Sequence, residues 1–321
     1  KADLFYLTIS QTKGGNLRDL VIFKLLEIQN KKWQIHLHGG YYRQLVDNDM
    51  AGWQRKANYK SVKKLVGAIV LSKSLKEIFE GMIDEDKIFV VSNCVDNQYL
   101  MSNEKFRNKI ITISQREIKH VLYLSNFIRT KGYSDALEIS NLEKKRLESA
   151  EKRLFHFDLA GKFFEDDEEQ FFFNFIHENN LEEYITYHGI VSGKKKENLL
   201  EKSDIFVLLT KYPNEYQPIS ILEALGNGMV IVTTDHAGIL DIVTDEIHGI
   251  VINKAALNIA EVAYSEIQNI DYYNAAIAGR EKIVRYYSER KYIADMSSVL
   301  GGDNLVIVNK FVGLVPSTIV A

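Results

Sequence analysis

Short apolar runs alternate along almost the whole chain with longer segments whose apolar residues recur at helical spacing. The runs are rich in branched and aromatic residues, which favour strands. Because strand, helix and strand follow one another at this spacing, we expect parallel sheets covered by helices on both faces. The runs predict strands at residues 4–9, 33–37, 66–71, 88–91, 120–124, 155–160, 184–188, 205–209, 229–233 and 249–252.

The alternation comes in two series that are separated by a polar stretch at residues 102–109. Two such series indicate an α/β protein with two doubly wound, Rossmann-like domains. We place the boundary near residues 108–119. The prediction is a first domain at residues 1–112 and a second at residues 113–285.

Local signals predict where several helices begin. Asn16 precedes the helical segment 17–29 and is the expected N-cap of a capping box. Pro218 suits the first turn of a helix at residues 219–225, where its missing N–H costs nothing, and two glycines follow that can end the helix. Further helices are expected at residues 74–81, 170–178 and 273–299.

Composition narrows the class of protein. The net charge is −3, so no global positive field points to a nucleic-acid partner. The single cysteine, Cys94, excludes an internal disulfide and a thiolate metal cluster. No apolar run approaches the ~20 residues that span a bilayer. We therefore expect a cytoplasmic protein in a reducing compartment.

The densest chemical signal is the segment at residues 214–228. Glu223 has apolar neighbours almost all round its helix, and a buried carboxylate is costly unless it is hydrogen-bonded. A ribose diol would satisfy it, while the backbone N–H groups of the helix start favour a diphosphate. The alternative is that Glu223 pairs with a nearby lysine and that Glu215 is solvated. The expected donor-binding residues here are Gln217, Pro218, Ile219, Ser220 and Glu223, with Glu215 as a catalytic candidate.

Glu215 and Glu223, with seven residues between them, are followed by Gly228 and by the segment at residues 233–238. This pattern resembles the donor motif of the retaining GT-B glycosyltransferases of family 4, and the similarity extends over roughly residues 2–299. It implies the GT-B fold, with two facing Rossmann-like domains and an interdomain cleft. It also implies retaining transfer from a UDP- or GDP-type sugar without a metal. The resemblance assigns Glu223 to the ribose hydroxyls and Glu215 to hydroxyls of the donor sugar.

A second element follows the strand at residues 120–124. Lys131, at a helix start, offers a point charge for phosphate oxygens and is a catalytic and donor-binding candidate. The family pattern usually has Gly-Arg where this chain has Ser125 and Asn126, so Arg129 is the candidate replacement cation. The alternative is that these loop cations are solvated. The family also places the loop around Gly189 near the nucleotide base.

A third element lies at the carboxyl end of the strand at residues 33–37, where open α/β sheets place ligands. His36 and His38 point the same way on an extended segment, yet no third zinc ligand is evident. The resemblance places His38 beside the reacting sugar. We expect His38 to be catalytic and His36 to be structural.

The loop at residues 10–18 ends another strand of the first domain, on the expected acceptor side. Gly14, Gly15 and Arg18 are candidates there, although solvated charges are the simpler interpretation. Residues 303–321 resemble the opening strand and glycine loop of a GT-B first domain, the unit that this chain lacks at its start. Residues 286–321 are expected to form a returning helix and a tail strand at 305–308 that joins the first sheet, with Gly313 facing the acceptor. A permuted chain, an incomplete chain and a separate added strand all stay open.

Three charged stretches are set aside. The acidic run at residues 165–169 resembles a metal cluster but suits the negative start of a helix. The basic run at residues 55–64 fits either a solvated helix face or contact with anionic lipid at the inner face of a membrane. The lysines at residues 194–196 are expected to be exposed.

The resulting prediction is a metal-independent, retaining hexosyltransferase without a cofactor, acting on a glycan or lipid-linked acceptor such as a cell-surface polysaccharide. Two alternatives stay open: a sugar-nucleotide epimerase of the same fold, and a nucleotide-sugar-binding module without transfer.

Overall fold

The structure is a computed structural model that describes residues 4–150 and 152–300. Contacts divide these residues into two compact units. Unit 1 comprises residues 4–93, 213–217 and 292–300, and unit 2 comprises residues 94–150, 152–212 and 218–291. Each unit is built on its own parallel sheet, and the ten strands predicted within the described residues are all present.

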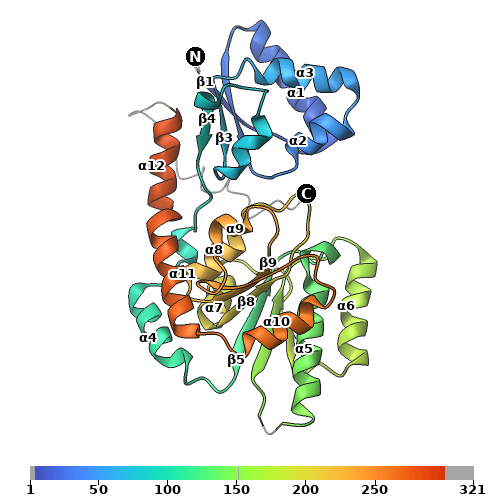
Figure 1. Ribbon diagram of the computed structural model, residues 1–321, viewed down its shortest axis with the longest axis vertical. Coiled ribbons are helices and arrows are strands. Elements are labelled where there is room, and N and C mark those ends of the chain that lie inside the picture. Colours follow the sequence, from blue (N-terminus) through green and yellow to red (C-terminus); the bar gives the residue numbers. More distant parts are fainter. Residues whose placement is uncertain (1–3, 151, 301–321) are drawn as a thin grey trace. The chain divides into compact units, whose positions relative to one another are not determined.

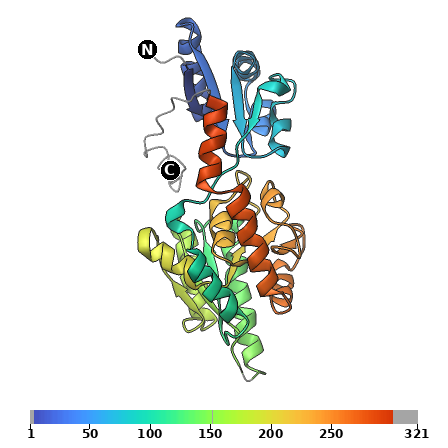
Figure 2. The ribbon, with the colours of Figure 1, turned by 90° about the vertical axis from the view of Figure 1, so that its left-hand side faces the viewer.

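Unit 1 has a four-stranded parallel sheet in the order β1-β2-β3-β4. Figure 1 shows its first three helices on one face of this sheet, while the end of α12 covers the other, as Figure 2 also shows. Alternating strand residues serve the two faces: Val70 packs toward the three helices, and Ile69 packs with Met296 of α12. The elements are β1 (Leu4–Thr8), α1 (Lys13–Ile28), β2 (Lys32–Leu37), α2 (Tyr42–Gln44), α3 (Gly52–Val62), β3 (Gly67–Val70), β4 (Ile88–Val90) and α12 (Glu289–Leu300).

Unit 2 has a six-stranded parallel sheet in the order β10-β9-β8-β5-β6-β7. Helices α5, α6 and α10 cover one face, and α4, α7, α8 and α11 cover the other (Figure 1). The strands are β5 (Lys119–Leu124), β6 (Phe155–Ala160), β7 (Ile185–Tyr187), β8 (Ile205–Leu208), β9 (Val230–Thr234) and β10 (Gly249–Ile252). The helices are α4 (Asn103–Ile113), α5 (Tyr133–Leu147), α6 (Asp166–Glu178), α7 (Gly193–Lys202), α8 (Ile219–Gly226), α9 (Ile239–Ile242), α10 (Ile259–Ile267) and α11 (Tyr272–Tyr286).

The predicted boundary after residue 112 is wrong, because unit 2 begins at Cys94. The polar stretch at residues 102–109 lies almost entirely in α4, which packs within unit 2. Lys109 is buried there, and its Nζ donates to the carbonyl oxygen of Asn227 at 2.8 Å. Residues 213–217, expected in the second domain, cluster with unit 1. The predicted tail strand at residues 305–308 lies outside the described residues.

Several predicted helix ends also need correction. α1 begins at Lys13 with Thr12 as its N-cap, and the Thr12 hydroxyl accepts from Gly15 N at 3.2 Å. Asn16 is instead buried in the first turn, where its Nδ2 donates to Asn58 Oδ1 at 2.8 Å. The expected helix at residues 273–299 is interrupted between α11 and α12, and the one at residues 74–81 is a short 3-10 helix, Ser74–Phe79.

Candidate functional site

The strand order of unit 2 reverses between β5 and β8, which are neighbours in the sheet. The chain leaves β5 toward α5 on one face and β8 toward α8 on the other. In open α/β sheets this reversal opens a crevice at the carboxyl ends of the strands, where ligands bind. The two loops are linked there, because Lys211 N donates to Thr130 O at 2.6 Å.

Lys131 lies in the loop after β5, in the 3-10 turn Arg129–Lys131 that leads into α5. Its Nζ lies 5.0 Å from the ring centroid of Tyr212, in the loop after β8. Asn126 lies in the same loop after β5, and its carbonyl oxygen accepts from the Tyr123 hydroxyl at 3.0 Å. Lys131 therefore lies where the two loops meet, and its role in phosphate binding stays a prediction.

Arg129 has a carboxylate partner on α6. Its Nε lies 3.1 Å from Glu168 Oε2, and its guanidinium lies 3.8 Å from the ring centroid of Phe171. The acidic run at residues 165–169 thus forms the start of α6, as expected, and also neutralises Arg129. The role of Arg129 as a replacement cation for phosphate stays a prediction.

Glu223 is only 2% exposed on α8, and its Oε1 lies 2.7 Å from Lys196 Nζ. Burial raises the pKa of the Glu223 carboxyl, and the Lys196 ammonium opposes that rise. This lysine pairing is the alternative that the sequence left open, and it occupies one of the two carboxylate oxygens.

Lys196 was missed as a site residue, and its predicted exposure is wrong. Its side chain is mostly buried, and its Nζ lies 4.1 Å from the ring centroid of Tyr99. Lys196 shares a face of α7 with Leu199 and Leu200, three and four residues on, which are both buried. That spacing is the signal that could have identified it.

The start of α8 has the geometry of an anion site. Pro218 is the N-cap rather than a residue of the first turn, and Ile219 and Ser220 are half-buried. The N-cap residues of the two helices, Pro218 of α8 and Gly132 of α5, make no side-chain capping hydrogen bond, although Asp135 in the first turn of α5 bonds to its own backbone N–H. The backbone N–H groups at the start of α8 therefore suit a phosphate ligand.

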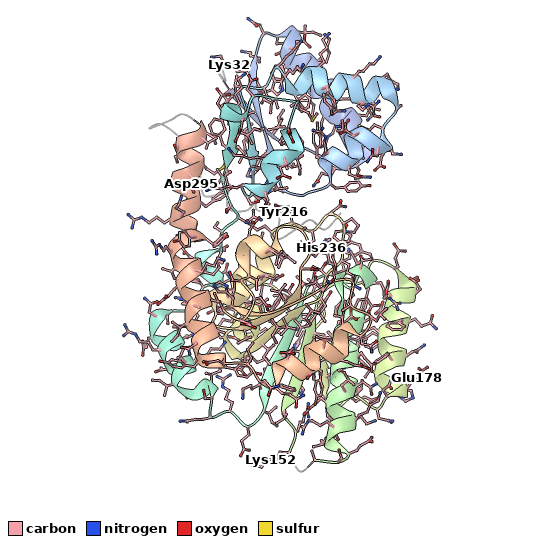
Figure 3. The ribbon with its side chains drawn as sticks, in the orientation of Figure 1. Lys32, Lys152, Glu178, Tyr216, His236 and Asp295 are labelled. Carbon is pink, nitrogen blue, oxygen red and sulfur yellow. The ribbon has the colours of Figure 1, made fainter. Side chains whose placement is uncertain are left out.

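Gln217 and Glu215 precede α8 in residues that cluster with unit 1. Gln217 is buried, and its Oε1 accepts from Asn93 N at 2.7 Å. Tyr216, labelled in Figure 3, lies in the core of unit 1, and its hydroxyl lies 2.9 Å from Ser72 Oγ. Gln217 and Tyr216 hold this loop in place, and the half-buried Glu215 is attached to it.

Two further loops belong to the same end of the unit 2 sheet. Gly189 follows β7, and its carbonyl oxygen accepts from Gly161 N in the loop after β6, at 3.0 Å. His236 follows β9, and its Nε2–H donates to Tyr212 O at 2.7 Å (Figure 3). His236 belongs to the segment that carries the family resemblance, but no local pattern singles it out.

His38 lies in unit 1 just beyond β2, and its ring stacks on that of His36 with centroids 4.0 Å apart. Burial lowers the pKa of His38 to about 4, so the imidazole is neutral at pH 7. His36 is fully buried, with Nδ1 2.6 Å from the Tyr6 hydroxyl, an environment that suits a structural residue. Among residues 4–150 and 152–300, no cluster of three or more His, Cys, Asp or Glu side chains suits a metal ion.

The acceptor-side candidates are placed differently from expectation. Gly14 and Gly15 lie in the first turn of α1 rather than in a loop, because the helix begins at Lys13. Arg18 is exposed and pairs with Asp19 at 2.8 Å, in keeping with a solvated charge. Gly313 lies outside the described residues. Of the helices that the structure describes, none is long and apolar enough to cross a membrane.

Comparison with known proteins agrees with this geometry. The chain is 25% identical over 201 residues to an uncharacterized glycosyltransferase of Methanocaldococcus jannaschii, and the match covers 60% of this chain. The chain spans about half the length of that curated relative, 48%.

Solved structures share the fold. HepE of Anabaena in complex with UDP matches with a TM-score of 0.71 at 15% identity, covering 93% of this chain and 78% of HepE. TarM of S. aureus, in a complex that includes UDP, matches with a TM-score of 0.63 at 19% identity, covering 85% of this chain and 52% of TarM. These similarities show the GT-B fold, with two Rossmann-like domains built on parallel sheets. Because the family model of the glycosyl transferases group 1 also matches residues 103–268, the chain belongs to that family.

Proposed function

We propose that the chain is a retaining glycosyltransferase that moves a sugar from a UDP- or GDP-type donor to a glycan or lipid-linked acceptor, without a metal. The observation that carries this proposal is the arrangement at the strand-order reversal. There Lys131 accompanies the starts of α5 and α8, and α8 also carries the buried Glu223. One cation and two helix starts suit a diphosphate, and a buried carboxylate suits a ribose diol.

The similar proteins support a uridine nucleotide as the donor class. HepE has been crystallised with UDP and with UDP-glucose, and TarM with UDP and alpha-GlcNAc-glycerol. In the proposed reaction, the bond between the anomeric carbon and the diphosphate breaks, an acceptor hydroxyl oxygen bonds to the same face of the sugar, and the hydroxyl proton passes to the departing diphosphate. Lys131 and the start of α8 stabilise the departing diphosphate. The family resemblance assigns Glu215 to the donor sugar and His38 to the reacting centre.

The test is a screen of UDP- and GDP-sugars with the purified chain. Slow release of free sugar and nucleoside diphosphate, without added metal and in the presence of a chelator, supports a metal-independent transferase. NMR of the sugar at the moment of release should show the anomeric configuration of the donor. An epimerised donor, inverted product or nucleotide binding without any turnover would each contradict the proposal.

A further inference from the structure

Helix α1 exposes a continuous apolar stripe on the side opposite to its buried face. Single exposed apolar residues are ordinary on a protein surface, but a contiguous patch of them marks a binding surface. The spacing of i, i+4, i+8 and i+11 places all four members on one side of the helix. The stripe consists of Leu17 (47% exposed), Val21 (56%), Leu25 (52%) and Ile28 (69%), while Leu20, Phe23 and Leu26 face the core.

Helix α3 packs beside α1 (Figure 1) and carries exposed aromatic and basic side chains of its own. The two helices are joined by buried polar contacts, among them Asn58 Nδ2 to Asn16 Oδ1 at 2.9 Å. The outer side of α3 and its C-cap presents Trp53, Lys56, Lys60 and Lys63, at the spacing of one helix face. Trp53 is 62% exposed, and the sequence of α3 contains no acidic residue.

The acidic residues of α1 do not offset these lysines, because each is already paired. Asp19 is buried against Arg18, with Arg18 Nη2 at 2.8 Å. Glu27 is bonded to Lys64 and lies 3.4 Å from Lys24. The exposed faces of these two neighbouring helices therefore carry an aliphatic stripe, an indole and an excess of positive charge.

We propose that these exposed faces of α1 and α3 dock on an anionic lipid bilayer. Aliphatic residues and a tryptophan on one side of a helix, with lysines beside them, are the composition of helices that lie in the membrane interface. The lysines meet the negative surface potential of the headgroups. A protein partner fits less well, because the cores of protein interfaces are depleted in lysine. The inference does not depend on the proposed transfer reaction.

The two tryptophans make docking directly measurable. Trp33 is 4% exposed and stacks on Phe23, so its emission should not change when vesicles are added. The fluorescence emission of Trp53 should shift to shorter wavelength when vesicles that contain phosphatidylglycerol are added. Vesicles of phosphatidylcholine alone should cause a much smaller shift. Rising salt should reduce the response. Trp53→Phe should remove the shift.

Co-sedimentation of variants with the same vesicles shows which surface of the protein binds the lipid. Val21→Ser with Leu25→Ser should lower the partition coefficient by about tenfold or more, since the apolar contribution is lost. Lys56→Gln with Lys60→Gln should lower it by roughly fivefold per lysine, because each lysine near an anionic surface contributes ~1 kcal/mol. Matched pairs of exposed residues on unit 2, Ile190→Ser with Leu240→Ser and Lys145→Gln with Lys254→Gln, should leave it unchanged.

Three results would overturn the proposal: no vesicle binding by the parent chain, equal losses in the unit 2 controls, or lipid-independent self-association that Val21→Ser with Leu25→Ser abolishes. The last result would make this surface an interface between two copies. Thermal unfolding of each variant confirms that the fold is retained. Should the serine pair fail to fold, the exposed lysine pair still decides between binding and no binding.

Discussion

The carboxylate of Glu223 is buried on α8 and bonded to a single lysine, Lys196. If Glu223 binds the donor ribose, Glu223→Gln should weaken nucleotide binding by about 1–3 kcal/mol, the range for hydrogen bonds to a charged group. Calorimetry with UDP and GDP measures this loss. Glu197→Gln on α7 is the matched control, because that carboxylate also pairs with a lysine, Lys194.

A purely structural ion pair makes a different prediction. Removing one partner leaves Lys196 without its carboxylate and lowers the free energy of unfolding, and Glu223→Gln combined with Lys196→Met should recover part of that stability. Nucleotide affinity should stay low in the double variant if the carboxylate binds ribose. Unchanged affinity in a folded Glu223→Gln variant would end that assignment.

Lys131 and Arg129 lie two residues apart but have different partners. Lys131→Ala should weaken binding of the nucleoside diphosphate by about 1–3 kcal/mol and leave binding of the nucleoside almost unchanged, because only the diphosphate meets the cation. Arg129→Ala is the control, since Glu168 already neutralises that guanidinium. Titration calorimetry of both variants with the nucleoside diphosphate and with the nucleoside measures these losses. Equal losses for both ligands would contradict a phosphate role of Lys131, and a selective loss in Arg129→Ala would make Arg129 the second cation.

At the scale of elements, the turn between β5 and α5 depends on one glycine. Gly132 has a φ of +79°, and a Cβ there would lie 2.5 Å from the carbonyl oxygen of Leu209. Gly132→Ala should therefore destabilise unit 2 by about 2–3 kcal/mol, through a left-handed backbone and a backbone clash. It should also weaken diphosphate binding, because it moves Lys131 and the start of α5.

Gly189 provides a matched control for this element. Its φ is +64°, but a Cβ there would meet open space. Gly189→Ala should lower the free energy of unfolding by only about 1–2 kcal/mol, the cost of a left-handed backbone for a residue with a Cβ. Chemical unfolding compares the two variants, and equal losses of stability would show that the Leu209 contact does not constrain the turn.

At the scale of the whole molecule, the candidate residues are divided between the units. His38 belongs to unit 1, whereas Lys131 and Glu223 belong to unit 2. His38→Gln should lower the transfer rate by at least about tenfold, a modest share of what a positioned polar group contributes, and leave nucleotide affinity nearly unchanged. Its imidazole is neutral at pH 7, because burial lowers the pKa to about 4, so the predicted role does not require a charge. Steady-state transfer and calorimetry test the two quantities separately. A full transfer rate with normal nucleotide affinity in the His38→Gln variant would show that His38 has no role in transfer.

The sequence by itself determined the elements of both units and much of the motif. All ten strands were predicted, because a buried parallel strand needs a continuous apolar run that is visible locally. The start of α8 was also predicted, since Pro218 acts through the nearest backbone alone. The family resemblance followed from the spacing of Glu215 and Glu223, which is likewise a local property.

Only the tertiary structure decided the partners of those residues. Glu223 pairs with Lys196 from α7, and Arg129 pairs with Glu168 from α6, across sequence separations that no local pattern spans. The boundary at Cys94 and the membership of residues 213–217 also depend on which surfaces pack together. Strand order also depends on the tertiary structure, since the reversal between β5 and β8 arises from crossovers that join distant segments. Helix and strand form from neighbours along the chain, whereas charge pairing, burial and sheet order are set by contacts that exist only after the chain has folded.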